Sequence, residues 1–268
     1  MNKIIVTPAG RKRYLEVLHL NLNKCKDEFD KWVIWVNTTN DEDIEYIKSI
    51  AEEYDYIELQ HSDIPVDPNG SHTATICGFF KKCIDENSVY LRLDDDIVYI
   101  HKNSIKDLFK FRLANENYFL VFGNILNNAI ITNLYQRNGI LTHLPIVNYD
   151  CLDENGWRNP NFSFDLHIHF FHKKTENKIE DFFIDNWELK NFERCSINSI
   201  SWLGKTFKTF NGEVGLSEEN WLSTDKPKEL NMPNIIFGNS LFNHYAFAPQ
   251  RGFLDTTNVL ERYKNISI

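Results

Sequence analysis

Apolar strand-like segments alternate with helix-like segments over the first third of the chain. Of all the features of the sequence, this alternation restricts the possible folds most. Residues 3–7, 31–38, 55–62 and 88–93 are short, mostly apolar, and rich in β-branched and aromatic side chains. Between them, residues 11–25, 41–54 and 72–85 are expected to form helices. Strands that are apolar throughout and separated by helices favour a parallel sheet covered on both faces. The sequence therefore predicts an α/β fold.

Polar residues stand at the carboxyl ends of these predicted strands. In open parallel sheets, ligands bind just beyond that edge. The turn Pro8-Ala9-Gly10 follows the first strand, and the Pro- and Gly-containing loop 64–71 follows the third. We therefore expect a ligand site there, near Thr7, Asn37, Asp63, Asp94, Asp95 and Asp96.

Three consecutive aspartates follow the fourth predicted strand in the segment LRLDDDIVYI. Strand alternation would place Asp94 and Asp96 on one face and Asp95 on the other until the backbone turns. Two carboxylates on one face provide half of a site for Mg²⁺ or Mn²⁺, hard cations that often complete their shell with substrate phosphates. A solvated acidic turn is the alternative, but apolar sequence flanks the run on both sides. We therefore predict a metal and phosphate site.

The second half of the chain is less regular. Residues 118–126 are expected to form a strand, and FSFDLHIHFF (162–171) alternates like another. On such a strand His167 and His169 share a face and His172 lies on the other, so we interpret them as solvent-facing and not as a zinc site, with an acceptor-sugar contact as the alternative. No Ser-, Gly- or Pro-rich linker is present, so one domain is expected over residues 1–268.

Charge and composition exclude several classes of protein. The net charge of −9 argues against a general nucleic-acid binder, which needs a dense basic surface. The five cysteines are scattered without a CxxC pair, so neither a disulfide framework nor a zinc knuckle is predicted. No secretory signal and no run of about 18 apolar residues is found, so we expect no transmembrane segment and a cytoplasmic location.

The chain resembles the GT-A type glycosyltransferases, whose DxD motif holds a divalent metal against the diphosphate of a sugar nucleotide. The resemblance extends over nearly the whole chain and is carried by VTPAGR (6–11), LRLDDDIVYI (91–100) and NSLFNHYAFAPQR (239–251). It implies a GT-A-like, Rossmann-related, mostly parallel mixed sheet flanked by helices. Residues 1–100 would form the nucleotide-sugar-binding half, and residues 101–268 the half that binds the acceptor and completes the pocket.

The resemblance also implies Mn²⁺ or Mg²⁺ as cofactor and suggests its ligands. Asp94 matches the acid nearest the ribose and the metal shell, and Asp96 matches the direct metal ligand. Many GT-A enzymes take a further ligand, commonly His, from the C-terminal part, and His244 is the candidate. The alternative for His244 is a core or rim histidine bonded to the backbone.

Nucleotide contacts are implied at the same edge of the sheet. Arg92 lies on the same strand face as Asp94, so it would either pair with phosphate or neutralise the aspartates. The expected nucleotide-sugar contacts are Thr7, Arg11, Asn37, Asp63, Arg92, Asp94 and Asp95.

The segment GLSEENWL (215–222) carries the candidate catalytic base. Inverting GT-A enzymes use a late Asp or Glu to remove the proton of the acceptor hydroxyl, and Glu218 or Glu219 matches that position. An acidic first turn of a helix that follows Ser217 as N-cap is the alternative.

Aromatic residues and glycines in the second half have simpler interpretations. Trp202, Trp221 and Phe247 would stack on a sugar ring or, more commonly for aromatics, fill the core. Gly212 and Gly215 are assigned to loops, because neither a GxGxxG after a strand nor a P-loop is present.

Together these features predict a metal-dependent glycosyltransferase that moves a sugar from a nucleoside diphosphate sugar to a glycan or other hydroxyl acceptor, in polysaccharide or surface glycan biosynthesis. Peripheral membrane contact fits this role, and no nucleic-acid partner is expected. One alternative is a sugar-1-phosphate nucleotidyltransferase, although PAGRKR matches only in part the glycine-rich, basic loop that such enzymes carry after their first strand. The other is a non-catalytic sugar- or cation-binding module.

Overall fold

The computed structural model describes residues 1–66 and 73–267. Its strands are β1 (Asn2–Ala9), β2 (Lys31–Val36), β3 (Ile57–His61), β4 (Ser88–Leu93), β5 (Ile97–Ile100), β6 (Val121–Leu126), β7 (Trp187–Leu189), β8 (Ser199–Leu203) and β9 (Asn234–His244). Its helices are α1 (Lys12–Lys24), α2 (Asp41–Glu53), α3 (Thr73–Phe79), α4 (Ser104–Ala114), α5 (Ala129–Arg137), α6 (Pro160–Thr175), α7 (Gly204–Lys208), α8 (Glu218–Asn220), α9 (Lys226–Leu230), α10 (Ala248–Leu254) and α11 (Val259–Ser267). Short 3₁₀ or π turns are η1 (Lys26–Glu28), η2 (Phe80–Lys82), η3 (Glu154–Arg158), η4 (Ile179–Phe182) and η5 (Trp221–Asp225).

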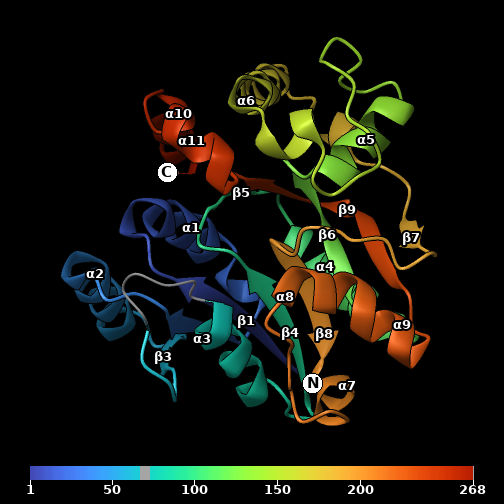
Figure 1. The fold of residues 1–268 in the computed structure, drawn as a ribbon. Coiled ribbons are helices and arrows are strands. Elements are labelled where there is room, and N and C mark those ends of the chain that lie inside the picture. Colours follow the sequence, from blue (N-terminus) through green and yellow to red (C-terminus); the bar gives the residue numbers. More distant parts are fainter. Residues whose placement is uncertain (67–72, 268) are drawn as a thin grey trace.

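All the strands of the described residues join one mixed sheet, with helices packed around it (Figure 1). The order across the sheet is β3-β2-β1-β4-β8-β6-β9-β5, and β7 also pairs with β9. Strands β5, β7 and β8 run against the others. The expected α/β architecture, a mostly parallel mixed sheet flanked by helices in one domain, is confirmed. The division into halves at residue 100 stays a prediction.

The first three predicted strand-helix units are present with small shifts at their ends. Helix α2 begins after Asn40, whose side chain accepts a hydrogen bond from the Asp43 amide at 3.1 Å, and its first turn is acidic as the helix dipole favours. The helix expected at 72–85 is divided into α3 and η2. The predicted loop at 64–71 lies mostly outside the described residues.

Strand β1 runs further than the sequence suggested. We expected Pro8 to begin a turn, but Pro8 pairs with Trp35 of β2 inside the sheet. A proline fits there because the β4 pairing already ends at Val6, so the missing N–H has no strand to face. Thr7, which we expected at the ligand edge of the sheet, therefore lies within β1. Thr7 is fully buried, and its hydroxyl accepts a hydrogen bond from the Trp32 indole at 2.9 Å.

The predicted strand at 162–171 is wrong, because these residues belong to helix α6. The helix begins at Pro160, and Asn159 caps it by accepting hydrogen bonds from the amides of residues 161 and 162. Its buried face includes Phe162, Leu166 and Phe170, which repeat every four residues. The interpretation of the histidines as one side of a strand is wrong for the same reason. His167 is buried and contacts the Tyr263 hydroxyl at 2.8 Å.

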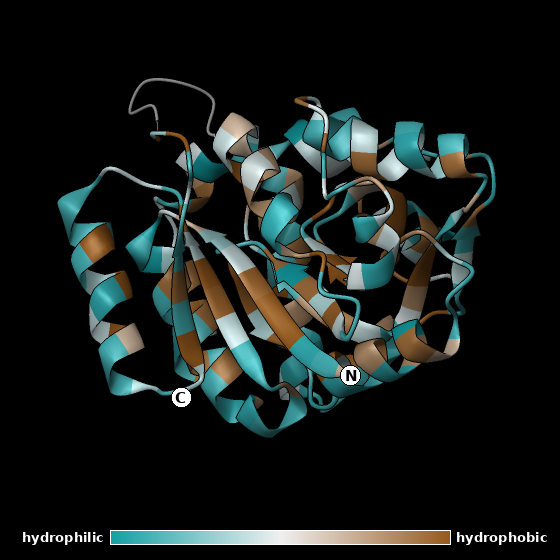
Figure 2. Cartoon of the chain, turned by 90° about the horizontal axis from the view of Figure 1, so that it is seen from below, coloured by the Kyte–Doolittle hydropathy of each residue, from teal (hydrophilic) through white to brown (hydrophobic). Residues whose placement is uncertain are grey.

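Two apolar clusters form the core, one on each side of the sheet. Consecutive residues of β1 enter different clusters, Ile5 one and Val6 the other, as strand alternation requires. Figure 2 shows the strands as mainly hydrophobic and the outer faces of the helices as hydrophilic. Among the described helices, none has both the length and the apolar character needed to cross a membrane.

The connections place an opening between β1 and β4. From β1 the chain moves outward to β2 and β3, and it then returns to β4 on the opposite side of β1. This reversal separates the loops that follow β1 and β4, and ligands of α/β sheets bind in the crevice at such points. Residues 10–11 and 94–96 flank this crevice.

Candidate functional site

A cleft of about 360 Å³ lies at the carboxyl ends of β1, β2 and β4, beneath helix α10. Its volume is in the range of small-molecule sites. The fold brings five of the expected contacts together there: Arg11, Asn37, Arg92, Asp94 and Asp95. The complete lining is Pro8, Gly10, Arg11, Asn37, Thr38, Ile76, Arg92, Asp94, Asp95 and Arg251.

The turn between β1 and α1 is only two residues long and holds Asp95 in place. The Gly10 amide donates a hydrogen bond to Asp95 Oδ2 at 3.1 Å. A Cβ atom at Gly10 would lie 2.9 Å from the carbonyl oxygen of Asn37, so glycine lets the β1 and β2 ends approach. The Oδ1 atom of Asn37 is buried and accepts no hydrogen bond from the described residues. Asn37 itself lines the cleft.

Arg11 links two of the three aspartates. Its Nε atom lies 3.1 Å from Asp95 Oδ1, its Nη2 atom contacts the same oxygen, and Nη2 lies 3.0 Å from Asp96 Oδ2. The expected grouping of Asp94 with Asp96 is therefore not found, because Asp95 and Asp96 share Arg11. Strand β4 ends at Leu93, so residues 94–96 turn and strand alternation no longer applies to them.

Asp94 belongs to a second group of charges. Arg92 Nε and Nη2 each lie 2.9 Å from Asp94 Oδ1, and Arg92 Nη1 contacts Glu218. The side-chain amide of Asn198, which precedes β8, donates to Asp94 Oδ2 at 3.0 Å. Arg92 is almost fully buried, so in this state it neutralises two carboxylates, the second of the two roles expected for it.

His244 reaches Asp96 from the far end of the chain. In the antiparallel pairing of β5 and β9, Ile97 stands opposite His244, which places the imidazole beside Asp96. The His244 Nε2 atom lies 3.5 Å from Asp96 Oδ1, and Nδ1 lies 3.3 Å from the Asn127 carbonyl oxygen. Both side chains are buried. Arg251 of α10 approaches the other carboxylate oxygen, with Nη2 at 3.2 Å from Asp96 Oδ2.

The surrounding charges determine the protonation of Asp96. Burial acts to raise its pKa, but Arg11, His244 and Arg251 outweigh burial and hold the pKa of Asp96 well below its usual range. Asp96 is therefore ionised at neutral pH. Burial raises the pKa of Asp95, against the opposing effect of Arg11.

In Glu218 the effect of burial on the pKa outweighs the effect of the neighbouring charges, the reverse of Asp96. Burial raises its pKa and Asp94 adds to the rise, whereas Arg92 opposes it. A carboxylate with a raised pKa accepts a proton more readily near neutral pH, which suits a general base. Glu219 is turned toward Arg194 instead, with Nη2 to Oε1 at 2.7 Å. Ser217 makes no capping hydrogen bond to α8.

Asp96 and His244 are the residues that could hold a divalent cation, and both lie buried beneath the residues that line the cleft. Asp96 Oδ1 is buried without a hydrogen-bond donor and faces His244 Nε2, while the other ring nitrogen lies near a backbone carbonyl that it can donate to. Two lone pairs that face each other need a proton or a metal ion between them. Within the described ranges, no group of three or more His, Cys, Asp or Glu side chains is arranged around one metal position. Phosphate oxygens and water would have to complete the shell, as is common for Mg²⁺ and Mn²⁺.

Several expected residues lie outside the cleft. Thr7 is inside the sheet, and Asp63 is exposed on the loop after β3, where it pairs with Lys82 at 3.0 Å. Trp202 is in the core, where it stacks on Tyr90. Two other expected sugar contacts pack against protein: Trp221 against Phe210 and Gly215, and Phe247 against His244.

Arg251 and Asn198 are the site residues that sequence reasoning missed. Arg251 ends the segment NSLFNHYAFAPQR, seven positions after the candidate metal ligand His244. This short spacing was a usable signal that Arg251 belongs to the site. Asn198 has no comparable signal, because only the antiparallel pairing of β8 with β4 brings it to Asp94.

Comparisons with known proteins identify a shared fold. No protein-family model matches the chain. No curated protein matches it in sequence. Solved structures do match over nearly its whole length. A mannosyltransferase from Pyrobaculum calidifontis in complex with GDP-Man and Mn²⁺ has a TM-score of 0.52 and 12% identity, over 94% of this chain and 58% of that one.

Two further structures extend the comparison. A glucosyl-3-phosphoglycerate synthase from Mycobacterium tuberculosis, in complex with phosphoglyceric acid, has a TM-score of 0.50 and 12% identity over 98% of this chain and 80% of that one. A CMP:2-keto-3-deoxy-manno-octonic acid synthetase complexed with CTP has a TM-score of 0.51 and 8% identity, over 98% of this chain and 99% of that one. The chain thus has the GT-A-like fold that glycosyltransferases and nucleotidyltransferases share.

Proposed function

We propose that this chain is a glycosyltransferase that binds a nucleoside diphosphate sugar in the cleft between β1, β2 and β4 and uses a divalent cation. One observation carries the proposal. Four carboxylates and three arginines meet at the crevice where α/β sheets bind ligands: Asp94, Asp95, Asp96, Glu218, Arg11, Arg92 and Arg251. In such a set the carboxylates can hold a cation, and the arginines can bind a diphosphate.

Arg11 and Arg251 are the residues that would bind the diphosphate. About a third of the Arg11 side chain and 28% of the Arg251 side chain are exposed, whereas Arg92 is only 5% exposed. The two exposed guanidinium groups therefore have donors that face the cleft as well as donors on the aspartates. Guanidinium groups bind phosphate through paired hydrogen bonds. Asn37 would accept a hydrogen bond from the nucleoside.

Asp96 and His244 would hold the cation, with Asp94 next to it at the mouth of the cleft. The cation, Mn²⁺ or Mg²⁺, would offset the charge that develops on the departing diphosphate. The mannosyltransferase of the same fold was solved with GDP-Man and Mn²⁺, which supports this choice.

Glu218 is the proposed general base. It is the one of the two candidate glutamates that is joined to the cleft, through Arg92 and Asp94. Its raised pKa suits removal of a proton from an acceptor hydroxyl. Glu219 pairs with Arg194 and lies 3.5 Å from Cys151 Sγ, so we assign it no catalytic role. The acceptor we propose is a glycan in polysaccharide or surface glycan biosynthesis.

A sugar-1-phosphate nucleotidyltransferase would use the same fold, and the synthetase complexed with CTP matches the chain over its full length. The turn after β1 favours glycosyl transfer. Only Gly10 and Arg11 separate β1 from α1, which leaves no loop to surround an incoming triphosphate.

Product analysis separates the three candidate functions. The protein is incubated with Mn²⁺ and a panel of nucleotide sugars, and separately with nucleoside triphosphates and sugar 1-phosphates. We expect slow release of nucleoside diphosphate from one nucleotide sugar, increased by a glycan acceptor. Pyrophosphate release from a triphosphate would indicate the nucleotidyltransferase. Binding without any product would indicate a module that does not catalyse.

A further inference from the structure

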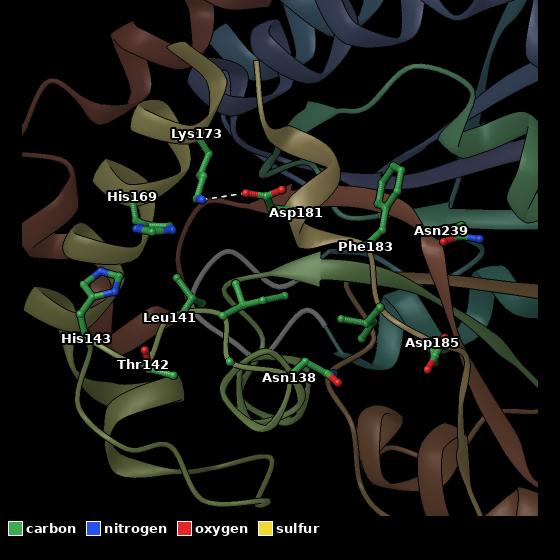
Figure 3. A pocket seen from close by; sticks show the side chains of 13 residues that line it. Asn138, Leu141, Thr142, His143, His169, Lys173, Asp181, Phe183, Asp185 and Asn239 are labelled. Carbon is green, nitrogen blue, oxygen red and sulfur yellow. Dashed lines mark hydrogen bonds and ion pairs between the residues drawn. The ribbon is translucent and has the colours of Figure 1, made fainter. Parts of the chain in front are cut away.

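A second pocket, of about 630 Å³, lies apart from the cleft and shares no lining residue with it. We call it the α6 pocket. Its walls come from the segment after α5, from helix α6, from the chain after η4, and from β9 (Figure 3). The lining is Asn138, Gly139, Ile140, Leu141, Thr142, His143, His169, Lys173, Asp181, Phe183, Ile184, Asp185 and Asn239.

Several polar groups in the α6 pocket make no hydrogen bond to the described residues. His169 Nε2 is buried and makes no hydrogen bond to the described residues. The side chains of Thr142, His143, Asp185 and Asn239 are exposed on the pocket wall, and none of them makes a hydrogen bond to the part of the chain that the structure describes. A buried group without a partner costs free energy that a ligand can recover. The pocket therefore offers both donors and acceptors to a ligand.

The charges of the α6 pocket exclude a strongly charged ligand. Lys173 Nζ is paired with Asp181 Oδ2 at 2.7 Å, as Figure 3 shows, and Asp185 adds a second carboxylate. Burial lowers the pKa of His169 to about 4, with His143 and Lys173 adding to the effect, so its ring is neutral near pH 7. An anion would meet two carboxylates and only one ammonium group, which is already paired. A cation would be attracted by Asp185, but within the described residues no three His, Cys, Asp or Glu side chains are arranged to hold a metal ion.

The pocket also has planar and apolar surfaces. The rings of His143 and His169 lie 4.7 Å apart between centroids and are tilted by 34°. Phe183 and Leu141 lie on either side of the Lys173-Asp181 pair in Figure 3 and line the same space. The C–H faces of a sugar ring pack against such surfaces, while its hydroxyl groups both donate and accept hydrogen bonds.

We propose that the α6 pocket binds a neutral carbohydrate, two or three sugar residues long, as a holding site for the glycan acceptor. The hydroxyl groups of a neutral sugar form hydrogen bonds with the unpaired donors and acceptors. They carry no charge that the carboxylates of Asp181 and Asp185 would repel. The volume agrees with a ligand of this size. The role as an acceptor site rests on the proposed glycosyltransferase function, whereas the binding of carbohydrate does not.

The test uses linear trisaccharides of glucose, galactose, mannose and N-acetylglucosamine, titrated into the full chain without nucleotide or metal. Saturation-transfer NMR and calorimetry in the millimolar range measure binding. Thr142→Trp fills the pocket, and the double variant Asp185→Ala, Asn239→Ala removes two unpaired polar groups. These side chains make no hydrogen bond or ion pair to the described residues, so the fold should tolerate the changes. Glu45→Trp, on the exposed face of α2 at the other end of the sheet, is the matched control.

We expect saturable binding of at least one trisaccharide, weakened about tenfold or more by both pocket variants and unchanged by the control. Thr142→Trp should also raise KM for the acceptor and leave donor hydrolysis unchanged. The proposal is overturned if no trisaccharide binds, if the pocket variants bind as well as wild type, or if inorganic phosphate or Zn²⁺ binds there instead. If the cleft binds no nucleotide sugar, the proposed function fails while the trisaccharide titration still decides this inference.

Discussion

His244 Nε2 faces the unpaired Oδ1 atom of Asp96 at 3.5 Å, although the two residues come from opposite halves of the chain. The antiparallel pairing of β5 with β9 produces this contact. A proton on Nε2 or a cation between the two atoms would satisfy this pair, and the proposed function assigns the cation.

Replacing His244 by alanine should therefore weaken Mn²⁺ binding in the presence of nucleoside diphosphate by about tenfold or more, because one of two protein ligands is lost. Calorimetry or electron paramagnetic resonance measures the affinity. His172→Ala, an exposed histidine of α6, is the control and should bind Mn²⁺ like wild type. Equal Mn²⁺ affinity in His244→Ala and wild type would exclude the ligand role.

Replacing Arg251 by alanine should change metal and nucleotide affinity in opposite directions. Without nucleotide, Mn²⁺ should bind more tightly, because a competing cation 3.2 Å from Asp96 Oδ2 is removed. With Mn²⁺ present, nucleoside diphosphate should bind about tenfold more weakly, because a phosphate donor is lost. Arg13→Ala removes an exposed arginine that pairs with Asp255 and serves as the control. A parallel loss of both affinities would show that Arg251 only supports the fold.

Glu218→Gln should lower turnover by about 10²- to 10⁴-fold and leave donor affinity nearly intact, because a general base acts on the acceptor and not on the donor. Glu219→Gln, which removes the partner of Arg194, should keep turnover close to wild type. Steady-state rates with a glycan acceptor measure both. If Glu218→Gln keeps the turnover of wild type, another residue is the general base.

The difference in stability between wild type and Glu218→Gln should depend on pH. The folded state holds more protons on Glu218 than the unfolded state does, because its pKa is raised by burial and by Asp94 against the effect of Arg92. The ionised form therefore destabilises the fold as pH rises above the unfolded value of about 4.3. Glu218→Gln should be more stable than wild type in urea unfolding at pH 7, and the difference should shrink toward pH 4. Arg92 keeps Asp94 as its partner at 2.9 Å. A variant that is less stable at both pH values would contradict this expectation.

The first half of the fold was predictable because its signals are local. The apolar segments, the Asn40 cap and the position of the aspartates after β4 depend on neighbouring residues alone. Helix α6 was predictable too, from Asn159 and Pro160 at its start, but the alternation within DLHIHFF matched a strand by chance. A helix cap followed by proline is a more specific signal than a short alternation of apolar and polar residues.

Most charge pairs within the site were not predictable. Strand alternation suggested the pairing of Arg92 with Asp94. The choice of Arg11 for Asp95 and Asp96, and the contact of Arg92 with Glu218, depend on where β4 ends and the backbone turns. The burial of Thr7 depends on the pairing of β1 with β2, which continues to Ala9. Both are consequences of long-range strand pairing, which leaves no pattern in the local sequence.

The most direct measurement is a titration of donor into wild-type and Asp96→Asn protein, each with and without Mn²⁺. A melting screen of nucleotide sugars first selects the donor, since a ligand at about 100 times its dissociation constant adds about 2.7 kcal/mol of stability. Asp255→Asn, which removes a carboxylate outside the cleft, is the control. We predict saturable binding by wild type in Mn²⁺ and binding weakened about 100-fold by Asp96→Asn or by removal of the metal. Asp255→Asn should bind like wild type. If no nucleotide sugar binds wild type, or if Asp96→Asn binds it equally well in Mn²⁺, the cleft is not a metal-dependent donor site.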